Sequence, residues 1–305
     1  MKLFILSQNK LNPLTERKFS RELDIQKITE NNLEKIFGLE YLTSEMSLNN
    51  LRIDTLAFNR ELNAFVIIEY KKDRNFSVID QGFAYLSLLL NNKADFILEY
   101  NKCRKESWDK KSVEWSQSRV LFISPMYTKY QIQAANFRDL PFELWEIHNF
   151  DKNVVIYNQI RPSDRSESIK VIGQSNELVR EITREIEVYT EEDHVQSVPN
   201  HIRDLYEEFK EKVLGFGDDI ETKALKKYVA FKTKSNFVSV IFQKSQLKLI
   251  LTIPKGSLND PFGLARDVSN IGHWASGDYE IILKTDSNLN DILLLVRQSY
   301  ENKRN

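Results

Sequence analysis

Three charged side chains lie in or directly after two neighbouring apolar segments of this sequence. Asp54 lies within LRIDTLAF, and Glu69 and Lys71 come at the end of NAFVIIEYK. Side chains two residues apart on a strand point to the same face, so we expect Glu69 and Lys71 to share a face. A hairpin that turns at residues 59–63 would bring Asp54 beside them.

Two carboxylates placed side by side repel each other unless a cation bridges them. Magnesium, or manganese in its place, prefers oxygen ligands, which Asp54, Glu69 and the carbonyl of Tyr70 could supply. Lys71 would then orient or activate a water molecule and could stabilise charge on a phosphate. This constellation therefore predicts a metal-assisted hydrolytic site.

With Asp54 followed by the Glu69-Tyr70-Lys71 triplet, the sequence resembles the PD-(D/E)XK nuclease superfamily. The resemblance implies a restriction-endonuclease-like α/β fold and magnesium-dependent cleavage of nucleic acid, with DNA as the expected substrate. It also implies that a glutamate on the first core helix completes the metal site. Glu30 takes that place, with Glu34 as the second choice one turn later. The proline of the family motif is absent, because Ile53 precedes Asp54.

A further likeness lies on the next expected helix. Gln81 and Tyr85 match the Gln-x-x-x-Tyr pattern of RecB-like members, and their spacing puts both on one helical face. The resemblance implies that they support the metal shell or the substrate. Taken alone, Gln81 would be a solvent-facing helix residue and Tyr85 a half-buried aromatic.

The same residues allow a second interpretation. Asp54 could pair with Arg52 or Lys71, and Glu69 could form a plain ion pair with Lys71, because such pairs are common on protein surfaces. The chain would then be a non-catalytic nucleic-acid-binding or ligand-sensing protein built on a nuclease-like fold.

The overall composition limits the kind of partner. The formal net charge is −1 over 305 residues, so a nucleic acid would have to be held by a local basic patch. The basic side chains that follow the site in sequence are candidates for phosphate contacts: Lys72, Arg74, Lys102, Arg104, Lys105, Lys110 and Lys111.

The remaining composition favours a cytoplasmic protein. The single cysteine, Cys103, suits a reducing compartment. Four scattered histidines form no zinc spacing, and no apolar segment is long enough to span a membrane. A homodimer is compatible with the sequence.

The elements that must position these residues alternate in type along residues 1–160, which predicts a mixed sheet flanked by helices. We expect helices over 28–42, 77–90 and 127–137. We expect strands over 51–58, 63–70, 94–100, 118–124, 141–150 and 153–160.

Residues 161–199 are expected to be a linker. Leu178, Ile182 and Ile186 recur every four residues and predict a packed helix there, although a solvated acidic linker fits nearly as well.

Residues 200–305 predict a small α+β domain. Helices are expected over 201–217, 260–269 and 289–303, and strands over 227–233, 236–242, 247–253 and 278–284. FVSVIF and DPFGLARDVSNIGHWASGDYEI resemble a domain of unknown function found behind nuclease-like domains and sometimes labelled a predicted transport protein. Arg266, Asp267, His273 and Trp274 could line a ligand pocket or simply form a turn.

Overall fold

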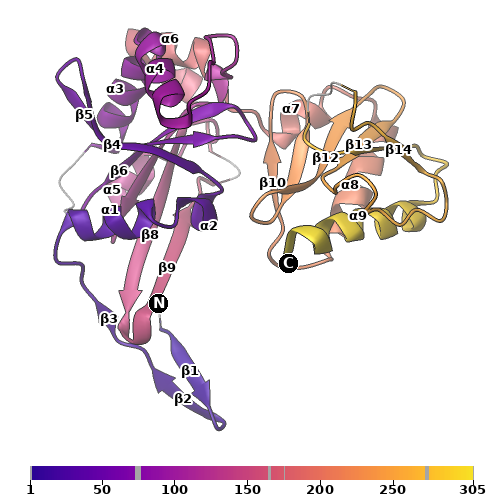
Figure 1. Cartoon of the computed structure of the whole chain (residues 1–305), viewed down its shortest axis with the longest axis horizontal. Helices are drawn as coiled ribbons and strands as arrows, with labels where there is room; N and C mark the ends of the chain where they lie inside the picture. The colour runs from indigo at the N-terminus through magenta and orange to yellow at the C-terminus, as the bar shows by residue number, and fades with distance from the viewer. Residues whose placement is uncertain (1, 73–76, 164–165, 175, 272–274, 305) are drawn as a thin grey trace. The chain divides into compact units, whose positions relative to one another are not determined.

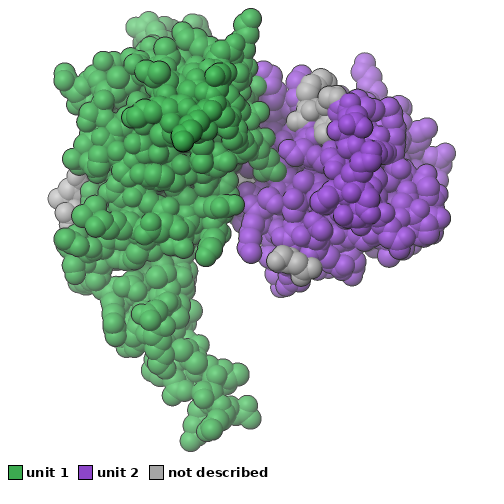
Figure 2. Space-filling view, in the orientation of Figure 1, with its two compact units in different colours: residues 1–187 green, residues 188–305 purple. Residues whose placement is uncertain are grey.

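The computed structural model describes residues 2–72, 77–163, 166–174, 176–271 and 275–304. The chain forms two compact units, Met1–Glu187 and Val188–Asn305 (Figure 2). The sequence placed the first boundary at 160, but residues 161–187 belong to the first unit because helix α6 packs on helix α3. Val179 and Ile182 are buried there, whereas Leu178, expected on the packed stripe, is 39% exposed.

One mixed sheet dominates the first unit. Its strands follow the order β3-β8-β7-β6-β5-β4, and β9 also pairs with β8. Pairing is antiparallel among β4, β5 and β6, parallel among β6, β7 and β8, and antiparallel between β8 and β9. The strands are β3 (Glu16–Arg17), β4 (Glu40–Leu48), β5 (Leu51–Asn59), β6 (Ala64–Tyr70), β7 (Arg119–Ser124), β8 (Phe142–Phe150) and β9 (Val154–Ile160).

Helices cover both faces of this sheet, so the expected mixed sheet flanked by helices is confirmed. Ile25 of α1 and Leu33 of α2 pack on one face, and α3, α4 and α6 contribute to the core on the other. A separate hairpin of β1 (Phe4–Ser7) and β2 (Lys10–Pro13) precedes β3 (Figure 1). The helices are α1 (Glu22–Glu30), α2 (Leu33–Phe37), α3 (Val78–Asn91), α4 (Lys93–Arg104), α5 (Lys129–Ala134) and α6 (Glu177–Glu185). The described part of this unit also contains the 3₁₀ turns η1 (Trp115–Gln117), η2 (Asp151–Asn153) and η3 (Ile169–Gln174).

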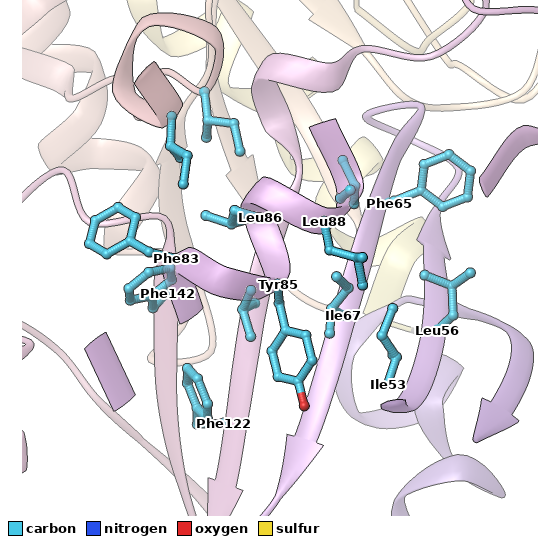
Figure 3. Close-up of a cluster of buried hydrophobic side chains, with 14 of the residues drawn as sticks. Ile53, Leu56, Phe65, Ile67, Phe83, Tyr85, Leu86, Leu88, Phe122 and Phe142 are labelled. Carbon is cyan, nitrogen blue, oxygen red and sulfur yellow. The ribbon is translucent and has the colours of Figure 1, made fainter. Parts of the chain in front are cut away.

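The expected strands and the helix nearest the candidate site form as predicted. Strand β6 is buried along its whole length, which explains why its sequence is a nearly continuous apolar run. Helix α3 begins at Ser77, whose hydroxyl accepts the backbone N–H of Asp80. Its buried side chains, among them Phe83 and Leu86, lie over the sheet beside Ile67 and Phe142 (Figure 3).

Two expected elements of the first unit are wrong. Residues 94–100 form part of helix α4, because Phe96, Ile97 and Tyr100 recur at helical spacing and a short apolar run does not separate strand from helix. The helix expected over 28–42 is interrupted after Glu30. Gly38 then ends α2 in the left-handed region at φ 65°, and β4 follows.

In the part of the second unit that the structure describes, six strands form an antiparallel sheet on which helices pack. The strand order is β10-β11-β12-β13-β15-β14, and α9 contacts β12 and β15. The strands are β10 (Glu221–Ala224), β11 (Val229–Lys232), β12 (Asn236–Phe242), β13 (Leu247–Leu251), β14 (Ala265–Asp267) and β15 (Tyr279–Leu283). The helices are α7 (Glu191–Val195), α8 (Asn200–Leu214) and α9 (Leu289–Arg304).

The helix expected over 260–269 does not form. Asp260 accepts the backbone N–H groups of Phe262 and Ala265, which closes a turn, and β14 follows. Of the expected pocket residues, Arg266 lies 3.8 Å from Glu280 and Asp267 pairs with Lys255 at 2.7 Å. His273 and Trp274 lie outside the described residues.

Within the described ranges, no helix combines the length and apolar character needed to cross a membrane.

Candidate active site at the end of the β5–β6 ladder

The structure brings Asp54, Glu69 and Lys71 together. Thr55 pairs with Ile68 across the antiparallel β5–β6 ladder, so Asp54 and Glu69 come one position further along it. Asp54 Oδ2 accepts the backbone N–H of Tyr70 at 3.1 Å, and Lys71 Nζ donates to Glu69 Oε1 at 2.6 Å. This arrangement matches the hairpin expected from the alternation of side chains.

Both carboxylates are removed from water. Asp54 is 7% exposed and Glu69 is 3% exposed. Burial, followed by the negative charge of Glu69, raises the pKa of Asp54 to about 7, although the Tyr70 N–H and the Lys71 charge act in the opposite direction. At neutral pH, Asp54 is therefore divided between its protonated and ionised forms.

Helix α3 carries the two polar side chains that the sequence singles out, Gln81 and Tyr85. The Tyr85 hydroxyl donates to the carbonyl of Arg52 at 3.0 Å. Burial, followed by the negative charge of Glu69, raises the pKa of Tyr85. Gln81 precedes Tyr85 by one turn and presents a buried Oε1 atom.

Two oxygen atoms of this group are left unsatisfied. Among the described residues, neither Glu69 Oε2 nor Gln81 Oε1 has a hydrogen-bond partner, although both atoms are buried. Buried polar atoms are nearly always paired, and an unpaired one costs free energy. These oxygens are therefore available to a cation or to a water molecule.

Glu30 has a different environment. Its Oε1 atom accepts from Gln26 Nε2 at 3.0 Å, Ser44 Oγ at 2.6 Å and Thr55 Oγ1 at 2.6 Å. Thr55 follows Asp54 directly on β5, so its side chain points to the other face of the sheet. Glu30 is thus engaged by three donors on the face opposite the Asp54 carboxylate.

Accordingly, the expected set of Glu30, Asp54 and Glu69 is not assembled as one cluster. No group of three or more His, Cys, Asp or Glu side chains within the described ranges is arranged to hold a metal ion. Glu34, the second choice, is exposed in the first turn of α2.

Glu22, in the first turn of α1, is the acidic residue that the sequence did not single out. Its negative charge contributes to the raised pKa of Asp54, and its Oε2 atom accepts the backbone N–H of Lys72 at 2.9 Å. One turn later, Gln26 donates to the backbone carbonyl of Asp54 at 3.1 Å. The spacing of Glu22, Gln26 and Glu30 places all three on one face of the helix, a signal that appears only when the helix is started at residue 22.

The basic side chains divide into separate groups. Arg104 donates to the carbonyl of Tyr41 on β4, and Tyr41 pairs with Ala57 of β5. Ala57 is three residues along β5 from Asp54, which corresponds to about 10 Å between these two residues. Lys102, in the last turn of α4, pairs with Glu99 on the same helix, and Lys105 ends that helix. Lys110 and Lys111 are exposed in the loop that follows.

Two further basic residues, Lys72 and Arg74, follow Lys71 closely in the sequence. Lys72 directly follows Lys71, and its Nζ atom donates to the carbonyl of Ser20 at 2.7 Å. Arg74 lies outside the described residues.

Comparison with known proteins gives three findings. An uncharacterized protein of Haemophilus influenzae is 44% identical over 299 residues, which covers 98% of this chain and 99% of that protein. Residues 191–303 match a domain family of unknown function, DUF5655. One chain from a solved structure described as an EndoMS–double-stranded DNA complex aligns with 45% of this chain and 50% of its own length, at 12% identity and a TM-score of 0.24. A score this low does not establish a common fold.

Proposed function

The chain belongs to the same family as the uncharacterized Haemophilus influenzae protein over nearly its whole length, and we propose that it is a metal-dependent nuclease that hydrolyses phosphodiester bonds in DNA. The proposal places the first unit among restriction-endonuclease-like folds. One observation carries it: two buried acidic side chains adjoin where the β5–β6 ladder ends, and one of their oxygens lacks a partner among the described residues.

The residues present fit magnesium. Magnesium is commonly held by one or two carboxylates together with water and substrate phosphates, so Asp54 and Glu69 suffice as protein ligands. The unpartnered Glu69 Oε2 atom is the ligand atom that a cation would bind. When bound, the ion would supply charge stabilisation for the phosphate and a more acidic water molecule.

The side chains around the carboxylates would divide the remaining work. Lys71 reaches the site with its ammonium group, which can hold a phosphate oxygen or the attacking water. Tyr85 and Gln81 fix one wall of the site from α3, and the Tyr70 N–H holds Asp54 in place. Glu22 is a candidate for orienting water on the α1 side.

A second candidate function rests on the contact between Lys71 and Glu69. At 2.6 Å this contact is a complete ion pair. If the pair is purely structural, the first unit is a non-catalytic nucleic-acid-binding or ligand-sensing module.

A cleavage assay separates the two. The purified full chain should nick or degrade DNA with magnesium or manganese and stop when the metal is chelated. Lys71→Ala should abolish cleavage and retain DNA binding, because binding is shared among many basic residues. Asp54→Ala should lose both cleavage and metal binding. Lys35→Ala, which removes an exposed lysine of α2, is the matched control and should cleave normally. Equal cleavage by the wild type and Lys71→Ala would exclude the nuclease proposal.

A further inference from the structure

A hollow of about 510 Å³ lies in the first unit, lined by side chains of α3, α5, η3 and α6. Phe83, which lines it, is two residues from both Gln81 and Tyr85, and two residues turn an α-helix through about 200°. Figure 3 shows the result, with Phe83 beside Phe142 and Tyr85 extending from the helix beside Ile67. The hollow and the candidate active site therefore lie on two different flanks of α3.

The lining of the hollow suits a flat, uncharged ligand. Phe83, Tyr130 and Phe137 contribute aromatic rings, of which Phe83 is buried and Tyr130 is 88% exposed. Pockets for small molecules typically have this size and this apolar, aromatic character. None of the described residues that line it is Lys, Arg or His, so a phosphate or carboxylate would find no cation inside.

Three polar side chains of the lining can hydrogen-bond to the edge of such a ligand. Asp80 can accept, and Gln133 can both donate and accept. Asn176 uses its Oδ1 atom to cap α6 through the Val179 N–H, and its amide group remains a donor. A planar ring with both donors and acceptors on its edge meets these groups.

The position of the hollow connects it with the candidate active site. Strands β6 and β7 are parallel, and α3 and α5 follow their carboxyl ends, so both helices start at the same edge of the sheet. One helix diameter, about 10 Å, separates the two flanks of α3. Lys129 and Lys170 are exposed beside lining residues in sequence, where they could meet phosphates outside the hollow.

We propose that this hollow binds one unpaired nucleobase close to the bond that is cleaved. The inference rests on the proposed nuclease function and adds the substrate class, DNA with a single-stranded segment. The base would stack on Tyr130, as bases stack on aromatic platforms of single-strand-binding proteins, and its phosphates would remain outside.

The test is binding of a single-stranded oligonucleotide that carries one 2-aminopurine, with the full chain in calcium so that the strand is not cleaved. Binding should change the 2-aminopurine fluorescence for the wild type and for Tyr130→Phe, which keeps the ring. Tyr130→Ala should lose the fluorescence change and weaken binding by at least about fivefold. Ala134→Phe should do the same by filling the hollow. Tyr41→Ala, which removes a 43% exposed tyrosine of β4 outside the hollow, should bind like the wild type.

The outcomes distinguish this inference from the function on which it rests. Wild-type affinity and fluorescence in both Tyr130→Ala and Ala134→Phe would overturn the base pocket, even if metal-dependent cleavage is intact. A fivefold loss for the single strand, with unchanged binding of a blunt duplex in which every base is stacked, would support it. If the wild type neither binds nor cleaves DNA with metal, both the function and the pocket are wrong.

Discussion

At the scale of single residues, Asp54 makes the stability of the first unit depend on pH near neutrality. Its pKa is about 7 in the folded protein and 3.8 in the unfolded chain, so the folded state holds the proton more tightly. The stability that this proton provides is fully present below pH 3.8 and is lost as the pH rises through 7. Without metal, ionised Asp54 therefore destabilises the first unit.

Asp54→Asn should remove this destabilisation. Asparagine can still accept the Tyr70 N–H through its carbonyl oxygen, but it carries no charge beside Glu69. The metal-free variant should exceed the wild type in stability at pH 8 by at most about 4 kcal/mol, and the two should converge toward pH 4. Urea unfolding followed by tryptophan fluorescence is suitable, because Trp108, Trp115 and Trp145 lie in the first unit. The assignment would be contradicted if the stability of the wild type, measured relative to that of Asp54→Asn, were lower at pH 5 than at pH 8.

The same proton should compete with a metal ion. Binding requires the ionised carboxylate, so manganese affinity should fall by up to about tenfold per pH unit below pH 7 and level off above it. Isothermal titration of the full chain at several pH values measures this. Lys35→Ala should follow the wild-type curve. An affinity that stays constant between pH 5.5 and 8 would show that Asp54 is not a ligand.

Part of this site can be predicted from the sequence. Asp54, Glu69 and Lys71 follow from two-residue alternation and one hairpin, both of which are local. Glu30 was assigned by its place on a helix expected to start at 28, but the helix starts at Glu22, and the register of that helix decides which acidic residue approaches Asp54. Contacts such as Thr55 to Glu30 join segments far apart in sequence, and no local pattern encodes them.

At the scale of elements, a close approach between Gly82 of α3 and the Phe142 ring of β8 positions the helix. A Cβ atom at Gly82 would lie 2.5 to 2.7 Å from the Phe142 ring of β8, so only glycine lets the helix sit this close to the sheet. The same helix carries Gln81 and Tyr85, and its distance from the sheet therefore sets their distance from Glu69.

Gly82→Ala should destabilise the protein by about 1 to 3 kcal/mol, although alanine is the better helix former by up to about 1 kcal/mol. Cleavage should fall as well, because a helix α3 that moves away from Phe142 also carries Gln81 and Tyr85 away from Glu69. Thermal unfolding and the DNA cleavage assay measure both effects. Gly173→Ala is the control, since its Cβ would come no closer than 3.5 Å to another atom. Equal stability of the Gly82→Ala variant and the wild type would show that the ring moves freely.

At the scale of the whole molecule, the two units have separate cores. The hydrophobic cluster of the second unit contains residues from Val195 to Tyr300. The matched domain family begins at residue 191, the first residue of α7. The sequence placed the start of this domain at 200, because a short acidic helix has too little apolar pattern to be recognised as part of a core.

The boundary is testable with two fragments, 188–305 and 200–305. Glu191 accepts hydrogen bonds from Tyr206 at 2.7 Å and from Lys210 at 2.6 Å, and a further one from Thr222, so α7 ties α8 to β10. The longer fragment should fold cooperatively. The shorter one leaves the Tyr206 hydroxyl and the Lys210 ammonium without that carboxylate, and it uncovers apolar surface beneath Val195. Its melting temperature should be lower by at least about 4 °C for each kcal/mol lost. Glu191→Gln in the longer fragment separates the two causes, because it weakens the polar contacts and keeps the apolar ones. Equal melting temperatures for both fragments would place the boundary at 200 after all.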